Sequence, residues 1–305
     1  MAQSPRLRLR VGVVGPGTMG ARHANVLARL PGVDFVGGFA RQDRLTDIVP
    51  LIDAAVVAVP TSAHHSVAAT LIRCGVHVLV EKPLAPSIAE AEELGALADK
   101  RGLVLMVGHI ERFNPAAQAI AGAVDCNSIV AITLTRVGPK PKKTKDVGVL
   151  LDSSIHDIDL VRWLTRSEII EHQAMLAGPH GGREDIAFLQ MRTASGVIAS
   201  LRNDWLSPAK ERTLVVKNRD RLFVGDLLLH TAVQHNIGGE PSRLATSGAD
   251  PLESELRAFV STVRGEAPNP IPALEGMRSL ASAISCLEGG VLARPLVGSD
   301  SKVIT

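Results

Sequence analysis

The fold is decided by residues 11–20, which read Val11-Gly12-Val13-Val14-Gly15-Pro16-Gly17-Thr18-Met19-Gly20. An apolar run of strand type, residues 9–14, leads into three glycines spaced G-x-G-x-x-G, and a helical pattern follows over residues 20–30. The first glycine permits a tight turn, the second lets a ligand approach the backbone, and the third lets the helix pack on the strand. The stretch therefore predicts a strand, a glycine turn and a helix whose free N–H groups bind phosphate.

A phosphate-binding turn between a strand and a helix is typical of a dinucleotide site. An acidic residue at the end of the second strand, residues 34–39, would bind the ribose 2′-hydroxyl of NAD, but Ala40 and Arg41 stand there. Arg41 suits the 2′-phosphate of NADP, because a guanidinium binds phosphate through two parallel hydrogen bonds. In the alternative, Arg41 is a solvated loop residue and Asp43 binds the ribose. We expect NADP or NAD, with NADP favoured, and contacts from Gly15, Gly17, Thr18, Met19, Gly20 and Arg41.

The first half of the chain alternates short apolar runs with helical patterns. Fully apolar strands that alternate with helices indicate a parallel sheet covered on both faces. The crossover between the second and third strands, residues 41–52, leaves room for one or two helical turns at most. The expected strands are 9–14, 34–39, 54–59, 76–80 and 103–107, with helices at 20–30, 66–74 and 88–101.

After about residue 115 the pattern changes to strand after strand with short links, which indicates an antiparallel sheet. We therefore predict an α/β protein with a Rossmann dinucleotide-binding domain, residues 1–115. A second, α+β domain with a large, mostly antiparallel open sheet follows over residues 116–305. Its expected strands are 129–137, 169–177, 185–192, 197–203, 213–216, 222–224 and 227–233, with a hairpin turn at 218–220 and a polar loop at 242–251. Its expected helices are 115–124, 155–164, 252–263 and 274–287.

Composition excludes several classes of protein. The 305 residues carry a net charge of only +2, which gives no reason to expect nucleic acid as a partner. No apolar stretch has the length of a membrane span, and the chain lacks tyrosine, so a catalytic Tyr-Lys pair is excluded. Three scattered cysteines, Cys74, Cys126 and Cys286, have no metal-like spacing and suit a reducing cytoplasm. We expect a cytoplasmic protein without a metal.

Two motifs carry candidate catalytic groups. Lys82 stands at the carboxyl end of a buried strand, the edge where ligands bind an open α/β sheet, although surface lysines are common. In the second motif a helix is expected to begin at Ser153 or Ser154, with Asp152 and His156 four residues apart on one face. A histidine beside a carboxylate is a plausible proton-transfer group, while the alternative is a capping aspartate and a surface histidine. The neighbours Asp157 and Asp159 are expected to stabilise the helix dipole.

These motifs together resemble the glucose–fructose oxidoreductase/inositol dehydrogenase (Gfo/Idh/MocA) family. The resemblance runs through most of the chain: the glycine turn, Pro60-Thr61-Ser62-Ala63-His64, Glu81-Lys82-Pro83, Asp152 with His156, and residues 251–256. It implies an NAD(P)-dependent oxidoreductase in which Lys82, Asp152 and His156 form the active site. It also implies cofactor contacts from Pro60, Thr61, His64, Glu81 and Lys82, and a homodimer or homotetramer formed through the antiparallel sheet.

A narrower resemblance involves residues 107–115, 136–139 and 146–149, which are similar to UDP-N-acetylglucosamine 3-dehydrogenases. It implies oxidation of a sugar 3-hydroxyl, or the reverse reduction, in a nucleotide sugar. His156 would take the hydroxyl proton, Lys82 would stabilise the oxygen, and Asp152 would orient the substrate or His156. Which of Lys82 and His156 is the formal base stays open, as do an inositol, free sugar or imine substrate and a non-catalytic ligand sensor.

Two further groups of residues have alternative interpretations. Glu111, Arg112 and Asn114 follow the fifth strand at the ligand edge, where they contact the sugar or the nicotinamide or form a hydrogen-bond cluster between the domains. A basic loop either meets a substrate diphosphate or is simply solvated. Trp205 either stacks on a ligand or packs in the core or an interface. The lysines of the basic loop are Lys140, Lys142, Lys143 and Lys145.

Overall fold

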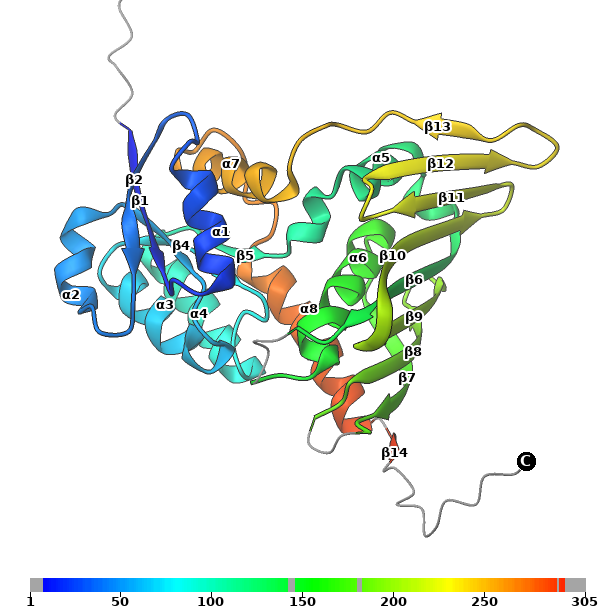
Figure 1. Cartoon of the computed structure of the whole chain (residues 1–305), viewed down its shortest axis with the longest axis horizontal. Helices are drawn as coiled ribbons and strands as arrows, with labels where there is room; N and C mark the ends of the chain where they lie inside the picture. The colour runs from blue at the N-terminus through cyan, green and yellow to red at the C-terminus, as the bar shows by residue number, and fades with distance from the viewer. Residues whose placement is uncertain (1–7, 142–145, 180–182, 290, 294–305) are drawn as a thin grey trace, which may run out of the picture.

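The computed structural model of the chain describes residues 8–141, 146–179, 183–289 and 291–293. Two β-sheets lie side by side with helices between them (Figure 1). The first has five parallel strands, and the second has nine strands that are mostly antiparallel, so the predicted α/β fold class is confirmed. Within the described residues, no helix has both the length and the apolar character needed to cross a membrane.

The first sheet has the strand order β2-β1-β3-β4-β5. This order reverses direction between β1 and β3, and ligands bind at the carboxyl ends of the strands beside such a reversal. The loops after β1, β3 and β4 therefore define the expected site. The strands are β1 (Leu9–Val14), β2 (Val33–Phe39), β3 (Ala54–Val57), β4 (His77–Glu81) and β5 (Leu105–Gly108), and the helices are α1 (Thr18–Leu27), α3 (His64–Arg73) and α4 (Ile88–Arg101).

The crossover from β2 to β3 is as short as its sequence predicts. It holds one helical turn, α2 (Leu45–Ile48), followed by the 3₁₀ turn η1 (Val49–Leu51). The helix α4 also begins as predicted, because Ser87 accepts a hydrogen bond from the backbone of Glu90 at 3.3 Å and donates one to the Glu90 carboxylate at 3.0 Å.

The second sheet has the order β13-β12-β11-β10-β6-β9-β8-β7-β14, and only the β6–β9 and β14–β7 pairs are parallel. Side chains alternate along each strand, as in β8, where Ala187, Leu189 and Met191 are buried and Phe188 is exposed. The strands are β6 (Ile129–Pro139), β7 (Ile169–Ala177), β8 (Ile186–Thr193), β9 (Ile198–Asp204), β10 (Leu206–Asn218), β11 (Arg221–Asp226), β12 (Thr231–Asn236), β13 (Ser242–Leu244) and β14 (Val291–Ala293).

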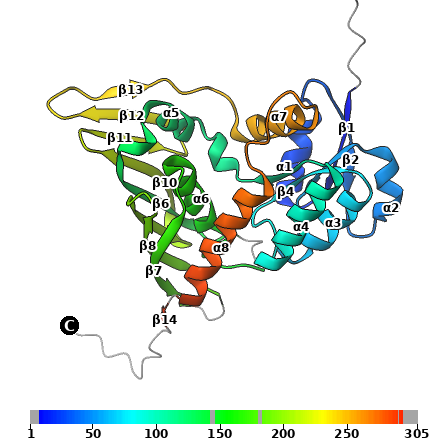
Figure 2. The ribbon, with the colours of Figure 1, turned by 180° about the vertical axis from the view of Figure 1, so that it is seen from behind.

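The helices α5, α6 and α8 lie on the face of this sheet that is turned toward the first sheet (Figures 1 and 2). The helix α7 lies beside the first sheet, where it packs against α1, and α8 packs against α4 as well as α6. The last two helices thus return to the first sheet, while the predicted domain division at residue 115 stays a prediction. The helices are α5 (Pro115–Ala123), α6 (Ile155–Thr165), α7 (Pro251–Val263) and α8 (Ala273–Gly289).

Two sequence predictions in this region are wrong. Residues 227–233 do not form one strand, because the Asp226 carboxylate accepts hydrogen bonds from the backbone of Leu228 and Leu229, both at 2.8 Å, and closes a turn. His230 then takes a positive φ of 55°, and β12 begins at Thr231. The polar loop at 242–251 contains the short edge strand β13.

Candidate active site

The glycine turn has the geometry that a bound pyrophosphate requires. Gly15 has a φ of +100°, and a Cβ there would lie 2.6 Å from the carbonyl oxygen of Ala58 in the loop after β3. A Cβ on Gly20 would overlap the carbonyl oxygen of Gly15, whereas one on Gly17 would meet only open space. Gly17 caps α1 without a side-chain hydrogen bond, and the first turn of α1 has no acidic residue. The helix therefore presents free N–H groups and a positive dipole end to the open space beside Gly17, which fits a dinucleotide.

The loops after β3 and β4 are held together by His64. Its Nδ1 lies 2.8 Å from the carbonyl oxygen of Pro83, and its Nε2 lies 2.9 Å from that of Val59. Burial lowers the pKa of this imidazole. Because both ring nitrogens face backbone oxygens, His64 positions the two loops and has no ring nitrogen free for a ligand. Pro60 is exposed, and the Thr61 N–H donates to the Asp146 carboxylate at 2.9 Å.

Glu81 also points away from solvent, toward α1. Its Oε1 lies 2.7 Å from Nε2 of His23, which is fully buried on α1. Burial acts to raise the pKa of Glu81, but the hydrogen bond and charge of His23, together with Lys82, outweigh it and hold the pKa below its usual value. A carboxylate beside Lys82 is thus tied to the helix that begins at the glycine turn.

A second buried carboxyl group lies near Glu81. Glu255 on α7 is fully buried, and neither of its oxygens has a hydrogen-bond partner among the described residues. Burial raises the pKa of Glu255 well above its usual value, and the negative charge of Glu81 adds to the shift. Burial thus favours the neutral, protonated form of Glu255, and repulsion by the Glu81 carboxylate acts in the same direction.

Lys82 is held across the gap between the two sheets. Its Nζ donates to Oδ1 of Asp152 at 2.8 Å and to the Asp152 carbonyl oxygen at 2.6 Å. Burial acts to raise the pKa of Asp152, but Lys82 outweighs it through charge and hydrogen bonding, so the pKa lies below its usual value. The Asp152 carboxylate, which was predicted to orient the substrate or His156, is bonded to Lys82 through Oδ1.

The motif that carries Asp152 begins as an unusual helix. Residues Leu150–Ser154 form a π-helical segment that runs directly into α6, so the expected start at Ser153 or Ser154 is wrong. The start is fixed earlier, because the Leu150 N–H donates to the Glu184 carboxylate at 3.1 Å. Wide π turns often occur at functional sites, and this one lets Asp152 reach Lys82.

His156 follows this segment and is 8% exposed. Its Nδ1 is enclosed and has no hydrogen-bond partner among the described residues, which leaves Nε2 as the ring nitrogen available to a substrate. Burial lowers its pKa well below the usual value, and the positive charges of Lys82, Arg136 and Arg212 act in the same direction. His156 is therefore neutral near pH 7 and able to accept a proton.

The residues after β5 lie in a hydrogen-bond cluster, which is the second of the two interpretations given for them. Glu111, Arg112 and Asn114 are nearly fully buried. Their side-chain partners come from the second half of the chain: Arg136, at 2.7 Å from Glu111; Asp159, at 2.7 Å from two nitrogens of Arg112; and the Leu227 carbonyl oxygen, at 2.9 Å from Asn114. These internal contacts favour the hydrogen-bond cluster, and a contact of the three side chains with a sugar or nicotinamide stays a prediction.

The expected role of Asp157 and Asp159 is also corrected. Both are buried, with Asp157 paired to Arg136 at 2.8 Å and Asp159 to Arg112. Sequence reasoning gave Arg136 no role, although a signal was present. Ile132, Leu134 and Arg136 share one face of β6 by their spacing of two, and a charged residue on an apolar face requires a buried partner.

Trp205 and Lys140 support the other side of Asp152. Trp205 is 6% exposed, and its Nε1 donates to the Ser153 hydroxyl at 3.1 Å. Lys140 lies 5.4 Å over the Trp205 ring, with its ammonium 2.5 Å from the buried Asp185 carboxylate. Trp205 therefore packs in the interior, as in the second of its two interpretations. The other lysines of the basic loop, Lys142, Lys143 and Lys145, lie outside the described residues.

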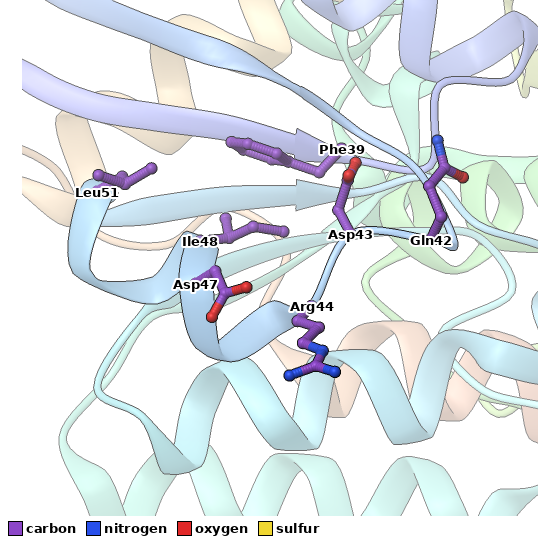
Figure 3. Close-up of a pocket in the computed structure, with 7 residues that line it drawn as sticks. All are labelled: Phe39, Gln42, Asp43, Arg44, Asp47, Ile48 and Leu51. Atoms are coloured by element: carbon purple, nitrogen blue, oxygen red, sulfur yellow. The ribbon is translucent and has the colours of Figure 1, made fainter.

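A hollow of about 380 Å³ lies beside the short crossover (Figure 3). Within the turn after β2, Asp43 uses one carboxylate oxygen to accept the Ala40 N–H at 2.7 Å, while Arg41 is exposed. The hollow lies at the end of β2, where the adenosine ribose is expected. It is lined by Phe39, Gln42, Asp43, Arg44, Asp47, Ile48 and Leu51.

Known proteins are similar to this chain in sequence and in fold. Residues 39–109 match the model of an oxidoreductase family with an NAD-binding Rossmann fold, and residues 130–222 match the GFO/IDH/MocA C-terminal domain. The UDP-N-acetylglucosamine 3-dehydrogenase of Acidithiobacillus ferrooxidans is 27% identical over 301 residues, which cover 91% of this chain and 96% of the relative. Inositol 2-dehydrogenase 2 of Paenarthrobacter aurescens is 30% identical over 226 residues, 63% of this chain and 68% of the relative.

A solved structure of the Acidithiobacillus ferrooxidans enzyme is similar with a TM-score of 0.87 at 26% identity, covering 93% of this chain and 98% of that one. The fold and the site thus define an oxidoreductase with a dinucleotide-binding domain. The chain belongs to the GFO/IDH/MocA oxidoreductase family, whose two domain models it matches in order.

The protonation of the buried Glu255, which lies near the Glu81 carboxylate, can be tested by the pH dependence of stability. Above pH 4.5 the unfolded chain releases the Glu255 proton while the folded chain keeps it, so the free energy of unfolding falls as the pH rises toward the raised pKa. The slope of this contribution is about 1.4 kcal/mol per pH unit. Glu255→Gln removes it, so urea unfolding at several pH values should show the variant gaining relative to the wild type as the pH rises. Glu253→Gln, on the same helix, is the control, and parallel curves for Glu255→Gln and wild type would contradict the assignment.

Proposed function

We propose that this oxidoreductase transfers hydride between a nicotinamide dinucleotide and a sugar carbon, at the 3-hydroxyl or 3-keto position of a nucleotide sugar such as UDP-N-acetylglucosamine. The observation that carries the proposal is the ion pair of Lys82 and Asp152 at the carboxyl edge of β4, set beside a neutral His156. Similarity to a UDP-N-acetylglucosamine 3-dehydrogenase along nearly the whole chain supports the substrate.

The dinucleotide would be held at the glycine turn, with its pyrophosphate on the N–H groups of Thr18 and Met19 and close to Gly17. Pro60 and Thr61 would border its nicotinamide half from the loop after β3. When bound, the nicotinamide accepts a hydride from the substrate carbon or returns one to it. Lys82 lies at the same edge of the sheet, one residue beyond β4.

The side chains then divide the remaining work. In the oxidation direction, His156 Nε2 takes the hydroxyl proton as the C–H bond gives up its hydride and the C=O bond forms. Lys82 donates a hydrogen bond to the same oxygen and stabilises its developing negative charge. Asp152 fixes Lys82 in place through two contacts. We assign the base to His156, because its lowered pKa keeps Nε2 able to accept a proton.

A second candidate is a polyol or free-sugar substrate on the same machinery. The similarity to an inositol 2-dehydrogenase, at 30% identity, favours it. The two candidates are distinguished by incubating the protein with NAD or NADP and a panel that includes UDP-N-acetylglucosamine, UDP-glucose, myo-inositol and glucose, and following the absorbance of the reduced cofactor. A non-catalytic ligand sensor is disfavoured, because Lys82, Asp152 and His156 are all present, with Lys82 bonded to Asp152 and its charge acting on His156.

Removing either candidate catalytic group should abolish turnover without weakening the binding of the cofactor. We expect Lys82→Met and His156→Ala each to lower kcat by about 100-fold or more. Calorimetry should give both variants nearly the dinucleotide affinity of the wild type, because the glycine turn is untouched. The matched controls are the surface substitutions Lys100→Met and His65→Ala. Turnover retained by both catalytic variants would refute the assignment.

We also propose that the protein prefers NADP and that the turn after β2 sets this preference. Arg41 and Arg44 are both exposed there, and Arg44 lines the hollow beside the crossover. A 2′-phosphate would meet these guanidinium groups, whereas the Asp43 carboxylate is partly engaged by Ala40.

Arg41→Ala and Arg44→Ala, separately and together, test this preference. Loss of a charge-assisted contact should raise the KM for NADP by about tenfold or more while changing that for NAD by less than about twofold. Lys100→Ala on α4 is the control for a general change in charge. Equal effects on both cofactors would rule out 2′-phosphate recognition at this turn.

We further propose a homodimer or homotetramer formed through the second sheet. Its outer face carries no helix within the described residues, as both views show (Figures 1 and 2). Large apolar side chains are exposed on adjacent strands of this face, with Met175 72% exposed, Phe188 43% and Ile198 48%. Open sheet faces with such residues are typical of subunit interfaces.

Light scattering at micromolar concentration should give the mass of a dimer or tetramer for the wild type. Phe188→Asp should shift the mass toward the monomer, because an interface would then bury an unpaired charge. Leu229→Asp, at a residue 73% exposed in the turn between β11 and β12, should leave the mass unchanged. A monomeric wild type would overturn the proposal.

The cysteines bear on the compartment in which the protein acts. The thiols Cys74, Cys126 and Cys286 are all free, and burial raises the pKa of Cys286 to about 12, so that thiol is unreactive. We expect the protein to work in the reducing cytoplasm.

A further inference from the structure

Arg212 on β10 is a charged residue to which the proposed reaction gives no role. It stands opposite Arg136 of β6, which in turn lies beside Asn203 of β9, so the three residues form one row across neighbouring strands. Residues that stand opposite each other in a sheet project from the same face. Arg136 and Asn203 both reach the Asp157 carboxylate on α6, at 2.8 Å and 2.6 Å. Arg212 therefore lies on the inner face of the sheet, one strand away from the residue that follows His156.

The inner face becomes open to solvent at Arg212. Its neighbours on the same face of β10, Leu214 and Val216, are fully buried, whereas the Arg212 side chain is 40% exposed. The Asp152 side chain is also partly exposed, at 28%. The charge of Arg212 helps to lower the pKa of His156, and Asp152 acts on the pKa of Arg212, which agrees with the short separation set by the strand register.

The anions around Arg212 leave part of its guanidinium unpaired. Among the described residues its one side-chain hydrogen bond is long, 3.4 Å from Nη1 to Oε1 of Glu111. The same oxygen accepts a shorter hydrogen bond from Arg136, at 2.7 Å, and Asn114 donates to the other Glu111 oxygen at 3.1 Å. Burial and the positive charge of Arg136 lower the pKa of Arg212. The edge formed by Nε and Nη2 is thus without a protein partner, in a place where positive charge is in excess.

A guanidinium edge with two N–H groups matches two oxygens of a phosphate or carboxylate. We propose that Arg212 binds an anionic group of the substrate, a phosphate or a carboxylate, close to the carbon that exchanges hydride. This inference rests on the proposed function, because it assigns a residue to the charged part of the same substrate. In a nucleotide sugar the group is the diphosphate, and in a sugar acid it is the carboxylate. A neutral sugar or inositol would leave the guanidinium edge unpaired, so Arg212 selects against that class.

Calorimetry tests the inference without turnover. The protein saturated with NADP is titrated with UDP-N-acetylglucosamine, N-acetylglucosamine 1-phosphate, glucuronate and neutral N-acetylglucosamine. We expect Arg212→Gln to raise the Kd of the anionic ligands that the wild type binds by about tenfold or more, and that of the neutral sugar by less than about twofold. Arg212→Lys keeps the charge beside Glu111 but loses the two-donor edge, so it should recover only part of the affinity. Arg221→Gln, at an exposed arginine of β11, is the matched control.

The pattern across the ligands separates this inference from the proposed substrate. Weaker binding of both phosphorylated ligands to Arg212→Gln would support the two together. Binding of glucuronate alone, lost in Arg212→Gln, would support the role of Arg212 and overturn the nucleotide sugar. Equal binding of the phosphorylated ligands to the wild type and Arg212→Gln would keep the nucleotide sugar and overturn the role of Arg212. A wild type that binds none of the anionic ligands would overturn both.

Discussion

The ion pair between Lys82 and Asp152 is the contact on which the site depends. Lys82 comes from the parallel sheet and Asp152 from the helix that covers the second sheet, so the pair exists only when the two halves are docked. With the Lys82 side chain 13% exposed, removing either partner would leave a poorly solvated charge, which is costly. The same contact fixes the position of the Lys82 ammonium, so docking and the proposed chemistry are coupled.

Two more buried pairs hold this docking in register. Arg112 reaches Asp159, and Glu111 reaches Arg136, each at 2.7 Å and each from the segment after β5 to the second half of the chain. Buried ion pairs add little net stability compared with apolar contacts, but they tolerate few alternative arrangements. We infer that these pairs fix the orientation of the two sheets, and with it the positions of Lys82 and His156.

The same charges act on the protonation of His156, Glu81 and Glu255. Burial lowers the pKa of His156, and the positive charges of Lys82, Arg136 and Arg212 add to the shift, so the ring is neutral near pH 7. Glu81 is an anion tied to α1, and burial together with the charge of Glu81 raises the pKa of Glu255. Lys82 therefore lies between the His156 ring, which resists protonation, and the Glu81 carboxylate, which attracts positive charge. These two neighbours favour a fixed position of the ammonium group.

Local patterns in the sequence were enough to predict the fold. The glycine turn, the short crossover and the helix capped at Ser87 depend on neighbouring residues, and each appears where the pattern placed it. The Asp226 turn and the π segment at Leu150 were missed because a side chain there replaces the regular backbone partner. The edge strand β13 was missed because its polar residues pair along only one side.

The site residues also divide into those that a local motif predicts and those that depend on distant contacts. Lys82, Asp152 and His156 were found because each lies in a short motif at a strand or helix end. The partners of Arg112 could not be found in this way, because Asp159 is 47 residues away and Glu275 is 163. Their pairing exists only in the folded chain, where the segment after β5 passes between the sheets. Substrate and cofactor preference are set by such distant contacts and by the turn after β2, so they can change while Lys82 and His156 stay as they are.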